Sequence, residues 1–456
     1  MASIDANPPE LSSRVQVALA SLCLLLSLEA LFFAPVNPDA AFTLRQARAQ
    51  AEGAVPCRDL LCEYTPLATS FMSIAGGSLL PSILIVQVAI LLCAILTYRL
   101  ARTLGHGPAA ARGSLLFSWA LMLANDGRGI EIEPFAVMFL LSAACTLGSA
   151  TDPGAGFRAG LWVAAAFWAK QYGLLGWAGL LAMCVIERRF KTALSLSAGV
   201  FAGVALGLAL LAGLGTQPAS LSDLFRSGAY PGYPLWMNLA TAPELLGLLI
   251  FALSPFLIAR STAVTPGLSL LVSLTGAAML PFLLRGYRHY WHFAIPFLAV
   301  LMFRVLPPAE AGRWTWIRRT TFAFALLSVG LDLGRCARDV VTNARDRQLE
   351  AARRLQGLVP AGATRALFLV DPALLPLLSG PLLAPREVGP KFTRFNRSEA
   401  EALLREADAV VWDRGSIGSD GPLRRLERDP VEALTRRGFK MLRDEGSIGI
   451  YLRSSP

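Results

Sequence analysis

Long apolar runs separated by short polar segments fill the first three quarters of the chain. A helix of about 20 apolar residues crosses the hydrocarbon core of a bilayer. Runs that reach or approach that length lie at residues 15–35, 79–98, 192–215, 245–259, 266–284, 292–303 and 320–331. Pairs of shorter runs, 113–124 with 134–150 and 161–168 with 174–186, flank polar segments. The pattern predicts about eleven transmembrane helices.

The pattern changes near residue 337 to that of an ordinary globular protein. Short apolar runs that suit buried strands alternate with segments of helical periodicity. The predicted strands are 366–370, 409–412, 439–442 and 449–452, and the predicted helices are 400–407 and 422–437. We therefore predict two domains. Residues 1–336 form a transmembrane domain with an outer-face loop at 36–78, and residues 337–456 form a small soluble α/β domain.

Composition agrees with a multi-pass membrane protein. Of the 456 residues, 54% are hydrophobic and 16% are charged, and the mean hydropathy is +0.51. The formal net charge of +10 would suggest a nucleic-acid partner in a soluble protein. Here much of the excess lies in short loops between apolar runs, where topology and anionic lipid explain it. We expect no nucleic-acid partner.

The basic residues also predict the orientation, because cytoplasmic loops retain Lys and Arg. Placing the N-terminus inside puts the basic loops near residues 99–112, 158, 188–191, 260 and 304–319 on the cytoplasmic side. The C-terminal domain and the unusual polar segments then share the outer face. The first run lacks a convincing cleavage site and is expected to be a retained anchor. Richness in Ala, Leu and Arg is typical of bacteria, so we predict a bacterial inner membrane protein with a periplasmic C-terminal domain.

Asp39 stands just after the first apolar run, where that helix reaches the membrane surface. The following segment, 40–52, places small and apolar residues on one helical face and charged residues such as Arg45 on another, which suits an interfacial helix. A carboxylate in a partly desolvated cleft can act as a base towards a hydroxyl or amine. The alternative is that Asp39 caps the interfacial helix.

The same outer loop carries Cys57 and Cys62. An oxidising periplasm would permit a disulfide between them, although two free thiols remain the alternative. The chain then returns to the membrane through Glu63, Tyr64 and a Thr-Pro-Leu turn. No histidine lies near the two cysteines, which argues against a metal site there.

The polar segment that contains Glu131 and Glu133 is also predicted to reach the outer face. Glu133 enters a helix before Pro134 and follows Glu131, and charges at that depth are costly and usually face a cavity. Glu133 is the candidate for a second carboxylate that orients the acceptor or holds a divalent metal. A solvated turn is the alternative, above all for Asp126 and Glu131, and Arg128 lies alongside them.

Cations and aromatics gather before the run that contains Pro296. Arg285 and Arg288, together with Lys170 between two short runs, could receive a phosphate or pyrophosphate at the membrane surface. The alternative is an aromatic belt that anchors the helix. The other members of this segment that we single out are Tyr287, His289 and His292.

Taken together, these segments resemble the GT-C superfamily of integral membrane glycosyltransferases, of the protein mannosyltransferase and aminoarabinose transferase kind. The resemblance covers nearly the full length. It rests on the Asp39 loop, the segments 128–134, 170–172 and 287–296, and the outer C-terminal domain. Some members have an Asp-Glu pair where this chain has Asp39-Ala40, which leaves Asp39 to act alone.

The resemblance implies a glycosyltransferase that moves a hexose or pentose from a polyprenyl-phosphate carrier to a lipid, glycan or protein acceptor. Asp39 would then activate the acceptor, with Glu133 as the second carboxylate, and Lys170, Arg285, Arg288 and Tyr287 would hold the carrier phosphate. Residues expected to support the acceptor or the loops are Arg45, Glu63, Tyr64, Arg128, His289 and His292. No cofactor is certain, although a divalent metal could take part. A transporter or flippase, or a lipid-linked glycan ligase or polymerase, remains the alternative.

Overall fold

The computed structural model describes residues 12–59, 65–150, 152–216, 266–285, 288–303, 311–378, 382–383, 397–415, 421–424 and 426–454. The chain forms two compact units. The first comprises Met1–Leu31, Ala54–Phe71 and Ile83–Arg338, and the second comprises Phe32–Gly53, Met72–Ser82 and Asp339–Pro456. The predicted domains, 1–336 and 337–456, stay a prediction, because compact units need not be domains.

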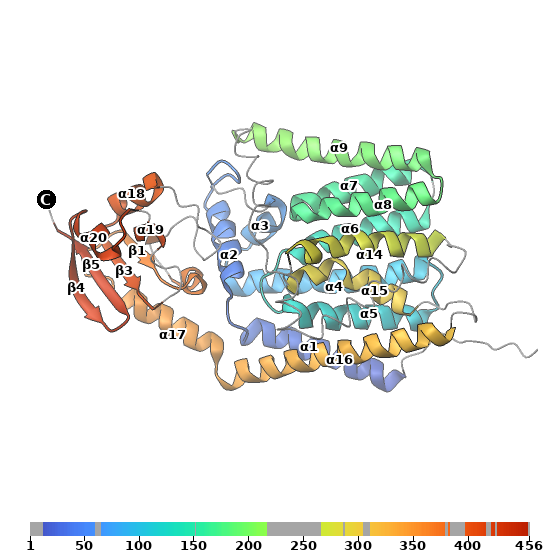
Figure 1. The fold of residues 1–456 in the computed structure, drawn as a ribbon, viewed down its shortest axis with the longest axis horizontal. Helices are drawn as coiled ribbons and strands as arrows, with labels where there is room; N and C mark the ends of the chain where they lie inside the picture. Colours follow the sequence, from blue (N-terminus) through green and yellow to red (C-terminus); the bar gives the residue numbers. More distant parts are fainter. Residues whose placement is uncertain are drawn as a thin grey trace, which may run out of the picture. The chain divides into compact units, whose positions relative to one another are not determined.

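The first unit is built from helices, most of which run alongside one another (Figure 1). They form where the apolar runs predicted them, except that the run 245–259 lies outside the described residues. The helices that lie wholly or mostly in this unit are α1 (Ser13–Phe32), α3 (Pro66–Ser73), α4 (Leu79–Thr103), α5 (Pro108–Met122), α6 (Glu133–Ser149), α7 (Pro153–Ala169), α8 (Leu175–Ile186), α9 (Phe190–Gly213), α14 (Pro266–Arg285), α15 (Ile295–Met302) and α16 (Ala311–Val341).

Within the described part of the chain, α1, α4 and α9 are long and apolar enough to cross a membrane. Shorter apolar helices lie at Glu133–Ser149, Gln171–Ile186 and Gly267–Leu283. Each helix of this second set adjoins a polar segment singled out from the sequence. These three helices are short because each ends at or begins from a polar turn. Non-helical backbone of this kind is tolerated at membrane depth if protein surrounds it.

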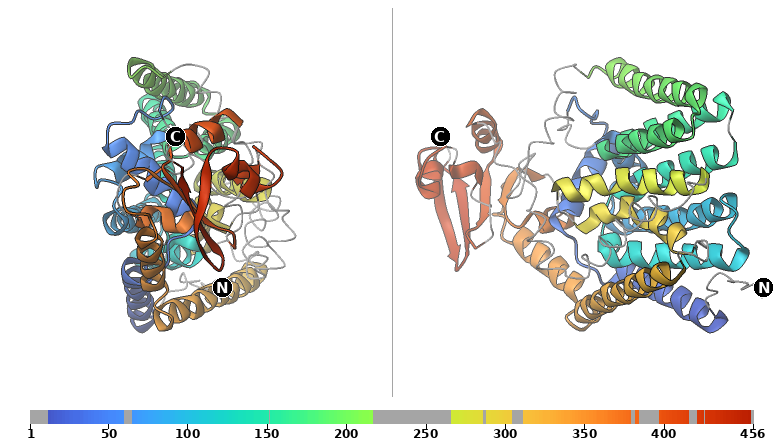
Figure 2. Two further views of the ribbon diagram at one scale, coloured as in Figure 1. Left: turned by 90° about the vertical axis from the view of Figure 1, so that its left-hand side faces the viewer. Right: turned by 45° about the vertical axis from the view of Figure 1, so that its right-hand side comes forward.

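Helices α7 and α9 pack with their backbones in close contact. Figure 2 shows the green helix α9 from two further sides. Glycines line this seam on both helices. A Cβ atom at Gly160 would collide with the carbonyl oxygen of Leu196, and one at Gly199 with that of Phe157. Further along, a Cβ at Gly207 would enter the ring of Trp168. Small residues let membrane helices approach in this way.

Among the residues that the structure describes, three short irregular helices interrupt the bundle. They are a π-helical turn, η1 (Leu123–Gly127), and two 3₁₀ segments, η2 (Gln171–Leu174) and η4 (Arg288–Phe293). π-Helical turns are rare and are frequently found at functional sites. The three segments carry or adjoin Glu131, Glu133, Lys170 and His289, so the irregular backbone and the candidate chemistry coincide.

The second unit contains α2 (Pro38–Ala51), α17 (Ala344–Gly357) and a five-stranded sheet of order β2-β1-β3-β5-β4. Strands β2 (Leu382–Leu383), β1 (Ala366–Leu369) and β3 (Ala409–Asp413) are parallel. Strands β5 (Ile448–Arg453) and β4 (Phe439–Glu445) continue the sheet antiparallel. The predicted strands and closing hairpin are confirmed, and β2 was not predicted, because two residues are too short to show a pattern.

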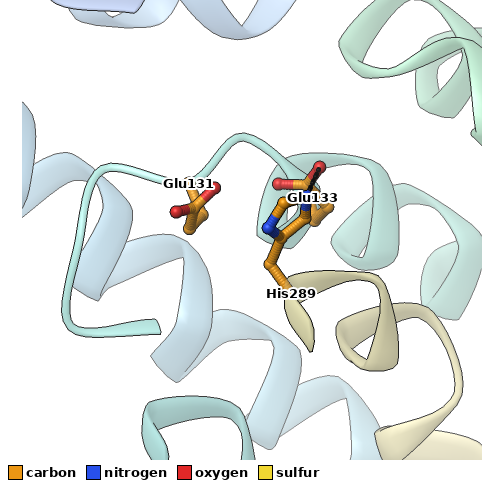
Figure 3. Close-up of side chains that lie close together, drawn as sticks. All are labelled: Glu131, Glu133 and His289. Atoms are coloured by element: carbon orange, nitrogen blue, oxygen red, sulfur yellow. Dashed lines mark ion pairs between the residues drawn. The ribbon is translucent and has the colours of Figure 1, made fainter. Parts of the chain in front are cut away.

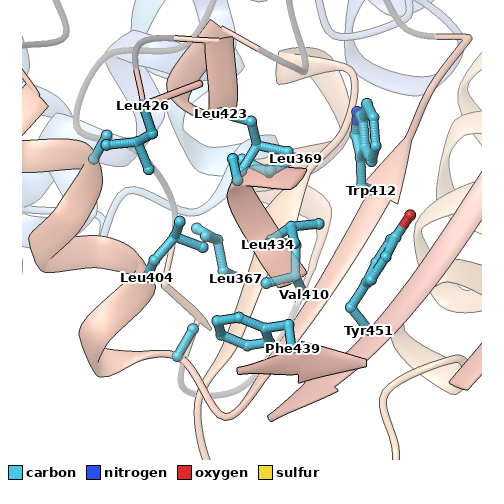
Figure 4. Packing of buried hydrophobic residues seen from close by; sticks show 13 residues of the cluster. Leu367, Leu369, Leu404, Val410, Trp412, Leu423, Leu426, Leu434, Phe439 and Tyr451 are labelled. Carbon is cyan, nitrogen blue, oxygen red and sulfur yellow. The ribbon is translucent and has the colours of Figure 1, made fainter. Parts of the chain in front are cut away.

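A hydrophobic cluster on one face of this sheet packs side chains of the strands against α18 (Arg397–Glu406), α19 (Gly421–Arg424) and α20 (Pro430–Thr435) (Figure 4). Another cluster joins α17 and the 3₁₀ segment η6 (Pro372–Leu377) to the strands. The single helix predicted over 422–437 is wrong. Asp429 caps a new helix by accepting from Val431 N, and Pro430 follows in the first turn, where it is favoured.

Candidate functional site

Glu133 and Lys170 form a buried ion pair in the first unit. Lys170 Nζ lies 2.9 Å from Glu133 Oε1, and the two side chains are 4% and 1% exposed. Glu133 lies in the first turn of α6, and Lys170 occupies the extended break between α7 and η2. Its backbone N–H donates to Ala166 O, and its own carbonyl accepts from Gly173 N. Both ends of the pair are thus fixed by backbone that the helices position.

His289 and Glu131 complete a cluster around Glu133. His289 Nε2 lies 3.8 Å from Glu133 Oε1, and Figure 3 shows this pair beside Glu131. One ligand atom from each of the three side chains lies within 4.8 Å of the others. Carboxylate and imidazole groups at that spacing could hold a divalent ion. Together with Lys170, the cluster joins three segments that were singled out separately from the sequence.

An aromatic ring lies beside the Lys170 ammonium. Lys170 Nζ lies 5.7 Å from the centroid of the Tyr290 ring, within the range of a cation–π interaction. Tyr172 meets the same ring edge-on at 5.1 Å, and His289 meets it at 4.5 Å. The sequence analysis assigned no role to Tyr290, and the aromatic cluster at a membrane boundary was the signal that could have identified it.

The π-helical turn η1 is held by polar side chains. His292, fully buried, places Nε2 3.0 Å from Met122 O. Gln87 Nε2 donates to Gly127 O at 2.8 Å, and Asn125 Nδ2 donates to Leu121 O at 2.8 Å. These contacts fix the backbone that leads into the loop of Glu131 and Glu133. His292 therefore contacts the turn that leads into this loop, and its expected role in supporting the acceptor or the loop stays a prediction.

Arg128 ties the same loop to two helices. Its Nη1 lies 2.7 Å from Glu29 Oε2 on α1, and its Nε lies 2.9 Å from Asp332 Oδ2 on α16. All three side chains are at most 12% exposed. The sequence analysis gave Arg128 a supporting role but missed both acidic partners. Their signal was an isolated charge within or next to an apolar run.

Asp39 lies in the second unit, in the first turn of α2. The alternative that Asp39 caps this helix is wrong, because Asn37 is the cap and its side chain accepts from Ala40 N at 2.6 Å. Pro38 separates the two residues and pre-sets the first helical turn. Asp39 is partly exposed, and Arg45 is on the next turns of the same helix. Burial lowers the pKa of Arg45 to about 10, so it keeps its charge at neutral pH.

The segment before α2 is held by α17. The Arg345 guanidinium donates twice to Ala34 O, at 2.9 and 2.6 Å. Gln348 accepts from Val36 N at 2.8 Å and donates to Val36 O at 3.0 Å. The chain just ahead of Asp39 is therefore fixed by the C-terminal part of the same unit.

Several predicted site residues lie outside what the structure describes. They are Cys62, Glu63, Tyr64, Tyr287 and the side chains of Arg285 and Arg288. Cys57 is disulfide-bonded, and its predicted partner Cys62 is among these residues, so the pairing stays a prediction. The expected roles of Asp39, Glu133 and Lys170 likewise stay predictions.

Neither a protein-family model nor a curated protein sequence matches this chain. Solved structures do. The chain is similar to the crystal structure of ArnT from Cupriavidus metallidurans bound to undecaprenyl phosphate, with a TM-score of 0.62, 13% identity, and coverage of 97% of this chain and 98% of that one. The chain has the GT-C fold.

A second GT-C structure agrees over almost the same extent. It is the Archaeoglobus fulgidus oligosaccharyltransferase tethered to an acceptor peptide, with a TM-score of 0.54, 11% identity, and coverage of 97% of this chain and 74% of that one. The predicted fold class is confirmed: the protein is an α-helical multi-pass membrane protein of the GT-C fold with a small α/β domain at its C-terminal end. At these identities, the similarity establishes the fold alone.

Proposed function

We propose that this GT-C protein is a membrane glycosyltransferase that moves a hexose or pentose from a polyprenyl-phosphate carrier to a lipid, glycan or protein acceptor. The observation that carries the proposal is the buried Glu133–Lys170 pair with His289 beside it, at the ends of short helices. Ionisable groups at membrane depth are costly and usually serve function. The ArnT structure, which has bound undecaprenyl phosphate, supports a polyprenyl phosphate as the carrier.

The proposed reaction is a single displacement at the anomeric carbon. The acceptor oxygen or nitrogen forms a bond to that carbon, while the bond from the carbon to the carrier phosphate oxygen breaks. The acceptor proton passes to Asp39, and polyprenyl phosphate leaves with the electron pair of the broken bond. Configuration at the anomeric carbon is inverted.

The remaining groups act on charge and position. Negative charge develops on the carrier phosphate as the bond breaks, and the cations Lys170, Arg285 and Arg288, with the hydroxyl of Tyr287, stabilise it. Glu133 fixes the Lys170 ammonium and helps to orient the acceptor. We place this chemistry on the outer face of a bacterial inner membrane, because the basic loops predict that orientation.

The test uses the full chain in nanodiscs with undecaprenyl phosphate carrying a radiolabelled sugar, and a membrane lipid extract as acceptor. We expect the label to move to the extract and free undecaprenyl phosphate to accumulate. Glu133→Gln should reduce both, whereas Glu350→Gln, on an exposed face of α17, should reduce neither. Movement of the intact labelled donor across sealed vesicles, with no release of carrier, would instead show a flippase.

A further inference from the structure

The Glu131–Glu133–His289 cluster suits a divalent ion by its ligands and spacing. However, Lys170 already forms an ion pair with the carboxylate of Glu133. Lys170 Nζ lies 2.9 Å from Glu133 Oε1, closer than the 3.8 Å that separates His289 Nε2 from the same oxygen. An ion bound to that oxygen at about 2.1 Å would lie within about 5 Å of the ammonium. The two cations would repel each other in a site that excludes water.

The lysine is built into this position. Its side chain is 4% exposed, and its backbone is anchored on both sides at the helix break. A Cβ on Gly173 would collide with the backbone of Ala166, so the chain must turn back tightly at this point. The Tyr290 ring, packed against Tyr172, lies beside the ammonium.

If Glu133 also bound a metal ion, its carboxylate would neutralise the buried Lys170 ammonium less completely. A buried ammonium is stable only when it is paired and hydrogen-bonded. The residues present therefore fit an ammonium at Glu133 better than they fit a divalent ion together with it.

We propose that the Lys170 ammonium supplies the positive charge that a divalent ion would otherwise supply at Glu133, so that Glu131, Glu133 and His289 bind such an ion only when Lys170 is replaced. The consequence for transfer, that it needs no divalent metal, rests on the proposed function. The consequence for metal binding does not. The two can therefore be tested separately on the same protein.

The binding test uses Mn²⁺ as the probe and the full chain in nanodiscs, stripped of metal by chelator. Electron paramagnetic resonance of unbound Mn²⁺ measures the number and affinity of sites. We expect Lys170→Met to gain one site, or to bind at least about tenfold more tightly than the wild type, because one like charge is removed. Adding Glu131→Gln to this variant should abolish the gain. Lys191→Met, an exposed lysine at the start of α9, is the matched control and should match the wild type.

A second comparison does not depend on the folding of the Lys170 variant. Glu131→Gln in the otherwise wild-type protein should leave Mn²⁺ binding unchanged. Loss of a Mn²⁺ site in this variant would show that the wild-type cluster binds the ion beside Lys170, and would overturn the proposal. Equal Mn²⁺ binding by well-folded Lys170→Met and wild type would also overturn it.

The transfer arm uses the labelled donor described above. Chelator should leave wild-type transfer unchanged, and Mn²⁺ should restore part of the transfer lost in Lys170→Met. Wild-type transfer that stops with chelator and returns with Mn²⁺ would overturn the proposal. If no preparation transfers sugar at all, the proposed function fails, while the binding comparisons still decide whether Lys170 excludes the ion.

Discussion

Asp39 is the residue whose replacement tests the chemistry most directly. It lies in the first turn of α2 while Asn37 does the capping, so an amide at position 39 keeps the helix and removes the base. We expect Asp39→Asn to lower transfer by a factor of about 10² or more without loss of folded protein. The measurement is the initial rate of transfer together with the melting temperature.

The matched control is Asp346→Asn, an exposed carboxylate in the first turn of α17 in the same compact unit. It should leave the rate unchanged. If Asp39→Asn transferred sugar at the wild-type rate, another group would have to be the base, and Glu133 would be the next candidate.

The carrier phosphate gives a second prediction at the scale of single residues. Replacing Arg285 and Arg288 by Ala should weaken binding of labelled undecaprenyl phosphate in nanodiscs by roughly 1.5 to 3 kcal/mol for each charged hydrogen bond lost. Arg188→Ala, an exposed arginine in the turn before α9, is the control and should bind normally. Unchanged affinity in the double variant would mean that these arginines serve anchoring, and that the phosphate binds elsewhere.

At the scale of elements, the π-helical turn η1 connects packing to the candidate site. Gln87→Leu removes the hydrogen bond to Gly127 O and leaves a buried carbonyl without that donor, which costs about 1–3 kcal/mol. We expect a lower melting temperature and a larger loss of transfer than that loss of stability explains, because the turn leads to Glu131 and Glu133.

Ser142→Ala is the control for this prediction. Its hydroxyl donates to Met138 O within α6, and its loss should leave transfer unchanged. If Gln87→Leu lowered the melting temperature but transferred sugar normally, η1 would contribute to stability without positioning the carboxylates.

The elements show which parts of this structure the sequence could predict. The helix after Asp39 followed from its spacing of apolar and charged residues, and α2 (Pro38–Ala51) confirms that a helix forms there. Its position along the membrane interface stays a prediction. The strands β1 and β3 followed from apolar runs between turns. Such features depend on neighbouring residues, which a sequence displays directly.

The ion pairs could not be predicted in the same way. Glu133 and Lys170 were each singled out, but for different tasks, and only the packing of α6 against α7 brings them together. Glu29 and Asp332 pair with Arg128 across more distant segments. The π-helical turn depends on donors from other helices, such as Gln87 and His292, so its own residues contain little signal of it.

At the scale of the whole molecule, the distribution of basic residues predicts the topology. A reporter fused at Gly312, at the start of α16 in the last basic segment, should score cytoplasmic, and one fused at Pro456 should score on the outer side. The measurement pairs a reporter that is active only in the cytoplasm with one that is active only outside. Cytoplasmic scores at both positions would contradict the orientation and the side of the membrane assigned to the proposed reaction.

The glycine seam between α7 and α9 has a consequence for variation in this chain. Because Gly160 and Gly199 face backbone rather than side chains, no rotamer change can make room, and even alanine forces the helices apart. In a saturation-mutagenesis library selected for folded protein, both positions should reject alanine as strongly as leucine. Leu194 and Phe201 of α9, which are 74% and 62% exposed, should accept most apolar residues. The absence of a Cβ atom at Gly160 and at Gly199 therefore limits which substitutions this protein can accept.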